Sequence, residues 1–226
     1  MKKTHSYRFP GLCILLLLLG APFHSFSHAI NYALEKAPEG QIFSYYGLLG
    51  YKHIVPEGID HILFVVAICL LNTKIKTIIW QATAFTVAHS ITLALSMKNI
   101  IVAPSDIVEP IISLSIAFVA VENLFLNTLK PWRVAIVFLF GLIHGMGFAS
   151  ALSEIGLPPN RFISSILYFN IGVELGQITV ILATYCLLIL PFKNKSWYKK
   201  AVVYPLSAVI AGVALYWTWG RLVNGQ

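Results

Sequence analysis

The residues best suited to chemistry lie in the stretch HIVPEGIDHILF, where ionisable side chains lead into an apolar run. The stretch contains His53, Glu57, Asp60 and His61, and the last two stand at the head of that run. Ionisable groups in a membrane segment are costly and mark candidate functional sites. Imidazole and carboxylate together suit nickel, cobalt, zinc or iron(II). The stretch therefore predicts a transition-metal site at the start of a helix.

Other apolar runs carry polar residues that could complete such a site. His89 occurs in TVAHSITLAL, His144 in FGLIHGMGFAS and Glu174 in FNIGVELGQ. A rise of 1.5 Å per residue places both histidines roughly 12 Å inside the outer ends of their helices. Glu122 falls near the opposite end of its own helix. This spacing predicts a site in the outer half of the membrane, with a second carboxylate nearer the cytoplasm.

Each of these residues also has a structural interpretation. A single membrane histidine often does no more than hydrogen-bond a neighbouring helix, and Asn170 and Gln177 are typical interhelical contacts. Glu57 would suit a helix N-terminus because the helix dipole favours an acid there. Six ionisable residues in membrane segments of one small protein are harder to explain by structural roles than any one of them alone. They are His61, His89, His144, Asp60, Glu122 and Glu174.

The composition indicates an all-α integral membrane protein. The 226 residues are 58% hydrophobic and 11% charged, with mean hydropathy +0.77, whereas soluble domains are about 25% charged. The net charge of +7 does not indicate nucleic-acid binding, because the lysines and arginines fall mostly in short loops. No CxxC motif occurs among the three cysteines, so neither a disulfide framework nor a thiolate metal site is expected.

The order of segments predicts three parts. Residues 1–29 have the basic start, short apolar core and small-residue cleavage site of a signal peptide, although an uncleaved first helix is an alternative. Residues 30–52 form a mixed, tyrosine-rich segment, expected to be exported and interfacial. Residues 53–226 form a six-helix transmembrane domain, whose first helix has a broken or re-entrant start. The helices are expected at 54–71, 77–97, 106–126, 134–152, 162–190 and 201–219.

Basic residues in alternate loops predict the orientation. Cytoplasmic loops are enriched in Lys and Arg. One set of loops carries only Lys98 and Arg161, and the other set carries many more. We therefore expect an inner-membrane, multi-pass protein whose mature N-terminus is exported. The basic loops contain Lys74, Lys76, Lys130, Arg133, Lys193, Lys195, Lys199 and Lys200.

Four stretches resemble the HupE/UreJ family of small membrane proteins, in particular its second, more divergent branch. They are HIVPEGIDHILF, TAFTVAHSITLAL, FGLIHGMGFAS and FNIGVELGQ, and they span roughly residues 43–190. The family is regarded as nickel or cobalt permeases linked to hydrogenase and urease maturation. The resemblance therefore implies a metal permease, with metalloenzyme-maturation proteins as further partners.

The family motifs match this chain residue by residue, with two departures at the first histidine. The family has a His-x-x-x-Gly-x-Asp-His element in its first helix and a His-Gly element in a later one. His53 corresponds to the leading histidine, with one extra residue before the glycine and Ile54 in place of a following proline. The remaining matches are Gly58, Asp60 and His61 for the first element and His144 and Gly145 for the second.

Together these observations predict a permease for a divalent transition metal, nickel or cobalt first and zinc as an alternative. The metal is the substrate, and no prosthetic group is expected. No GxxxxGK[ST] motif occurs, so flux would be passive or driven by the membrane potential. The expected partners are the metal ion and the lipid bilayer. The predicted metal residues are His53, Asp60, His61, His89, His144, Glu174 and Glu122.

Two other functions stay open at this stage. An intramembrane zinc hydrolase could use Glu174 or Asp60 as a base, although the chain has neither an HExxH nor a GxSxG element. A non-transporting accessory protein could bind the metal and hand it to a partner. Metal flux distinguishes both of these from a permease.

Overall fold

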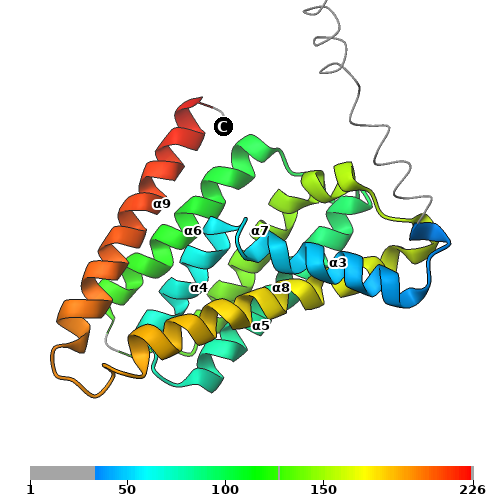
Figure 1. Ribbon diagram of the computed structural model, residues 1–226. Helices are drawn as coiled ribbons and strands as arrows, with labels where there is room; N and C mark the ends of the chain where they lie inside the picture. The colour runs from blue at the N-terminus through cyan, green and yellow to red at the C-terminus, as the bar shows by residue number, and fades with distance from the viewer. Residues whose placement is uncertain (1–33, 127, 225–226) are drawn as a thin grey trace, which may run out of the picture.

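The computed structural model describes residues 34–126 and 128–224, and the predicted signal peptide at 1–29 lies outside the described residues. Figure 1 shows a bundle of helices, and the described residues contain no strand. The helix α3 comes first and is followed by six further helices, α4 to α9. Their bounds are α3 Glu39–Ile54, α4 Ile59–Leu71, α5 Ile75–Met97, α6 Ser105–Phe125, α7 Arg133–Ile155, α8 Phe162–Thr184 and α9 Tyr204–Asn224.

Short helical segments extend two of these helices. The 3-10 turn Pro159–Arg161 leads into α8, and the π-helical segment Tyr185–Ile189 continues it. A second π-helical segment, Lys199–Val203, leads into α9. The predicted helix positions therefore agree with the structure to within a few residues at most ends.

The helices are long and apolar enough to cross a membrane. Five continuous helices meet this condition, and α3 with α4 gives a sixth span if the two are taken together. These two helices are bent by 68° relative to each other. The prediction of an all-α membrane protein with about six spans is confirmed, and the broken start expected for the first span is this bend. The segment 30–52, expected to be interfacial, contains most of the helix α3.

The helices pack mainly as three pairs, α5 with α7, α3 with α8, and α6 with α9, while α4 contacts α6 and α8. Small residues allow two of the pairs to approach closely, as is common between membrane helices. A Cβ added at Gly172 would fall well inside contact distance of the Gly47 carbonyl oxygen on α3. A Cβ at Gly145 would likewise overlap the His89 carbonyl oxygen. Backbone contact therefore fixes the helices that carry the candidate site.

A buried ion pair joins the end of α6 to the start of α7. It lies at the end of the bundle that carries the basic loops, called the lysine-rich end below. Arg133, which the charge pattern assigns to a loop, is the first residue of α7, and its side chain is 0% exposed. Its Nη1 lies 3.1 Å from Glu122 Oε2, and its guanidinium also donates to Asn123 Oδ1 at 3.2 Å. Arginine suits this position because its planar fork can bond several acceptors at once.

Candidate metal centre

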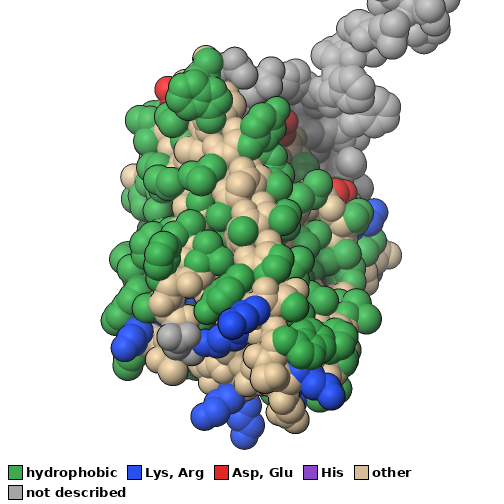
Figure 2. Space-filling view, turned by 90° about the vertical axis from the view of Figure 1, so that its left-hand side faces the viewer, with side chains coloured by type: hydrophobic (Ala, Val, Ile, Leu, Met, Phe, Trp, Pro, Cys, Tyr) green, Lys and Arg blue, Asp and Glu red, His purple; other side chains and the backbone are tan. Residues whose placement is uncertain are grey.

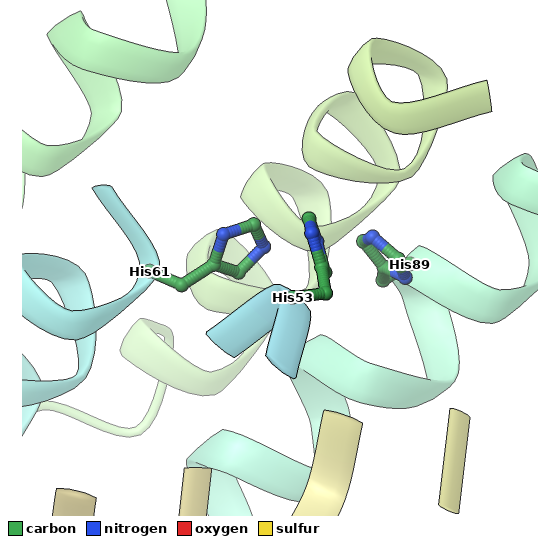
Figure 3. Close-up of side chains that lie close together, drawn as sticks. All are labelled: His53, His61 and His89. Atoms are coloured by element: carbon green, nitrogen blue, oxygen red, sulfur yellow. The ribbon is translucent and has the colours of Figure 1, made fainter. Parts of the chain in front are cut away.

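Three histidines from three helices meet inside the bundle. His53 ends α3, His61 lies in the first turn of α4, and His89 lies in the middle of α5. One ring nitrogen from each can be chosen so that all three lie within 4.8 Å of one another. Figure 3 shows the three imidazoles facing a common space. The bend between α3 and α4 brings His53 and His61 together, with ring centroids 4.7 Å apart.

His144 of α7 adds a fourth imidazole, with its ring centroid 5.2 Å from that of His61. The Nε2 atoms of His53, His61, His89 and His144 are all buried and have no hydrogen-bond partner. Buried polar atoms in folded proteins are nearly always paired. Four unpaired imidazole nitrogens in one place could together bind a cation, because neutral imidazole is a common ligand for transition metals.

The opposite ring nitrogens of three of these histidines lie close to oxygen atoms. His61 Nδ1 lies 3.1 Å from Asp60 Oδ1, and His144 Nδ1 lies 2.9 Å from the Phe140 carbonyl oxygen. His89 Nδ1 lies 3.4 Å from Asn170 Oδ1 on α8. A proton on Nδ1 would satisfy each oxygen and leave the lone pair on Nε2. Metal-binding histidines are oriented in this way by a carboxylate or carbonyl.

Phenylalanine rings surround the imidazoles. Phe148 lies against His53 in a tilted arrangement with ring centroids 3.8 Å apart, and Phe169 stacks on Phe148. Phe85 lies 4.9 Å from His144 between ring centroids. The low polarity of these rings strengthens any electrostatic interaction with a cation. Sequence reasoning did not select these residues, because phenylalanine in a membrane helix carries no distinguishing signal, although Phe148 directly follows the Gly145-x-Gly147 pattern.

The predicted carboxylate ligands Asp60 and Glu174 differ in how they relate to the histidines. Asp60 is beside the cluster, where its contact is with His61. Glu174 follows Asn170 by about one helical turn, and its Oε1 accepts a hydrogen bond from Thr83 at 2.6 Å while Oε2 is buried and unpaired. The group of described residues close enough to share one metal ion contains His53, His61 and His89, and it includes neither Glu174, Asp60 nor His144.

Glu122 is not brought to the histidines. Its carboxylate lies near the end of α6, and its charged partner is Arg133. A carboxylate neutralised by an arginine is a weaker cation ligand than a free one. In this structure Glu122 therefore belongs to the ion pair at the lysine-rich end, and the histidine site stands without it.

Comparison with known proteins agrees with the motif pattern. A family model described as "HupE / UreJ protein" matches residues 30–221, which is most of the chain. No curated protein and no solved structure matches the chain. The family consists of membrane proteins associated with nickel and cobalt uptake, of a transporter or accessory kind and not known as enzymes. The match covers every helix that contributes to the histidine site, and the chain belongs to the HupE/UreJ family.

Proposed function

We propose that the protein is a membrane permease for a divalent transition-metal ion, with nickel or cobalt as the first candidates. The observation that carries this proposal is the set of four buried imidazoles whose Nε2 atoms have no partner. Nitrogen ligands of this kind favour nickel, cobalt, copper or zinc over magnesium or calcium. Asp60 and Asn170 would hold two of the rings in the ligating orientation.

The position of the cluster suits transport of a cation. It lies between helices of the bundle, where ionisable membrane residues commonly mark an ion pathway. Glu174 lies about one turn after Asn170 on α8, and Thr83 lies nearly two turns before His89 on α5. Both would offer oxygen atoms to an ion leaving the histidines. Inward movement of a dication gains about 2.3 kcal/mol per charge for each 100 mV of membrane potential, so no nucleotide hydrolysis would be needed.

The test is metal flux into proteoliposomes that contain the purified protein. We would compare Ni²⁺, Co²⁺, Zn²⁺ and Mn²⁺ for the native chain, His61→Ala and His144→Ala. Thr179→Val is the matched control, because Thr179 is exposed on α8 and bonds only its own helix at Leu175. We expect saturable nickel or cobalt flux that both histidine variants lose and the control keeps.

The same experiment separates the alternatives. Tight binding of metal without flux, in protein that is correctly folded, would contradict the permease and favour metal handover to a partner. Flux that persists in both histidine variants would show that the ion does not pass through the cluster.

A further inference from the structure

A cavity of about 680 Å³ opens at the lysine-rich end of the bundle, where α4 ends about 15 Å along its axis from His61. It lies where the α4–α5 loop meets the segment between α8 and α9. Lys74 comes from the first of these, and Lys193, Lys195 and Lys199 come from the second. None of the described residues that line it is acidic. Figure 2 shows Lys and Arg side chains gathered at the lower edge of one face, below a largely hydrophobic surface.

The N-terminus of α5 adds to the positive potential of this cavity. Lys74 is the N-cap residue of α5, and both Lys74 and Thr77 line the cavity. The Lys74 side chain does not cap the helix, and the first turn contains no acid. The side chain of Asn72 accepts a hydrogen bond from the Lys74 N–H at 2.8 Å. The first N–H groups of a helix lack partners within the helix and favour an anion. A phosphate group commonly occupies such a position.

Tyr198 provides a neutral hydrogen-bond donor among the lining residues. Its side chain is 5% exposed, and its hydroxyl is buried without a hydrogen-bond partner. Burial raises the pKa of Tyr198 to about 12, so the phenol keeps its proton at neutral pH. Close by in the sequence, Leu187, Leu190 and Trp197 are exposed large apolar side chains. Polar donors therefore adjoin a surface suited to hydrocarbon.

We propose that this cavity binds the phosphate of an anionic phospholipid headgroup. The ligand chemistry is a phosphate anion, and the apolar side chains beside the cavity favour the membrane lipid over a soluble phosphate as its source. Basic pockets between membrane helices bind such headgroups, and each Lys or Arg near an anionic surface contributes appreciably. The site is separate from the histidine cluster, so it does not depend on the proposed transport function.

The positive-inside rule offers a simpler reason for the same lysines, because it requires only that basic residues lie on one side. The two explanations differ in whether lipid binding depends on which lysines line the cavity or only on the total charge at this end. Lys74 and Lys195 line the cavity, whereas Lys130 and Lys200 lie at the same end of the bundle without lining it. All four side chains are exposed. Two double variants, Lys74→Gln with Lys195→Gln and Lys130→Gln with Lys200→Gln, therefore remove equal charge.

The experiment is a lipid titration of the full chain in neutral detergent, followed by native mass spectrometry. Phosphatidylglycerol, phosphatidylcholine and inorganic phosphate are the probes. We expect phosphatidylglycerol to bind in preference to phosphatidylcholine, and its affinity to fall about tenfold or more in the Lys74/Lys195 variant. The Lys130/Lys200 variant should bind like the native chain. If the first double variant does not fold, Lys195→Gln alone should show the same trend.

Three outcomes would overturn the proposal. Equal losses in both double variants would show that only net charge matters. Equal binding of the two lipids would show that the cavity does not select an anion. Competition by inorganic phosphate at the same concentration as the lipid would assign the cavity to a soluble phosphate instead.

Discussion

Each of three histidines in the cluster relies on a different kind of oxygen. The Asp60 carboxylate contacts His61 Nδ1 from the neighbouring position, and the Phe140 carbonyl oxygen contacts His144 Nδ1 from the same helix. His89 alone is oriented from another helix, by Asn170 of α8. The Asn170 amide group is fixed in turn, because its Nδ2 donates to the Ile166 carbonyl oxygen at 2.8 Å. Asn170 is therefore the residue through which α8 contacts the candidate metal centre.

We predict that Asn170→Ala weakens metal binding without abolishing it. The substitution removes the acceptor for His89 Nδ1 but leaves all four imidazoles, and loss of such an outer partner typically costs about 10- to 100-fold in affinity. Asn170→Asp keeps an acceptor at the same position and should bind at least as well as the native chain. Isothermal titration of Ni²⁺ or Co²⁺ into detergent-solubilised protein measures both. Equal affinity for native chain and Asn170→Ala would contradict the orienting role.

The sequence identified the histidines more readily than the residues that orient them. Asp60 could be found because it adjoins His61 in a family motif. The contact between His89 and Asn170 could not, because 81 residues separate the two and the helix pairing decides it. The charge pattern assigned Arg133 to a loop, whereas the structure buries it at the start of α7, and the difference has a physical reason. A basic residue at the end of a membrane helix usually extends toward water, whereas Glu122 and Asn123 hold this one inside.

At the scale of elements, close helix contact determines where the histidines lie. The α3–α8 pair holds His53 at the end of α3 next to the helix that carries Asn170. Gly50 and Gly172 line the contact between these two helices, and a Cβ at either would overlap the backbone of the other helix. Neither glycine has a positive φ, so close approach is the reason that glycine is needed here.

We predict that Gly172→Ala lowers stability and disturbs the metal site. The added methyl group must push α3 away from α8, and overpacking of this kind costs about 1–3 kcal/mol. Gly212→Ala in α9 is the matched control, because nothing lies within 4 Å of its added Cβ. The control should be neutral or slightly stabilising, since alanine is the better helix former. Thermal unfolding in detergent measures both, and equal effects would contradict the close-contact explanation.

Most helix positions could be predicted because a long apolar run in a membrane protein has few alternatives. The start of the first span could not be predicted in detail. Residues 39–54 carry charged and aromatic side chains that suit an interface, so their sequence does not reveal that one face packs on α8. Ile42, Tyr46, Gly50 and Ile54 form that buried face. The break between α3 and α4 could be predicted from Pro56 and Gly58, whereas the close contact of His53 with His61 across it could not.

The whole molecule is asymmetric in charge along the bundle. Lysines from two segments gather at one end, around the cavity described above. The opposite end carries carboxylates at Glu39, Glu57, Asp106, Glu109 and Glu154. Such a distribution fits a fixed orientation with the lysine-rich end in the cytoplasm.

We predict that opposite ends of the bundle react with a membrane-impermeant maleimide from opposite sides. Lys195→Cys should be labelled only after permeabilisation, whereas Glu154→Cys should be labelled in intact spheroplasts, because the positive-inside rule places these ends in different compartments. Both positions are exposed. Both variants belong in a background without Cys13 and Cys186, since Cys69 is buried. The reverse labelling pattern would contradict the orientation.

The phenylalanine rings around the imidazoles affect how cobalt(II) binding at the histidines could be observed. Aqueous cobalt(II) is pale pink because six water molecules surround it. Among the imidazoles and the neighbouring rings of Phe85, Phe148 and Phe169, the ion would exchange most of that water for ring nitrogens. Four-coordinate cobalt(II) with nitrogen ligands is intensely blue. A detergent solution of the protein should therefore turn blue as cobalt binds, and the colour should fade with each histidine that is removed.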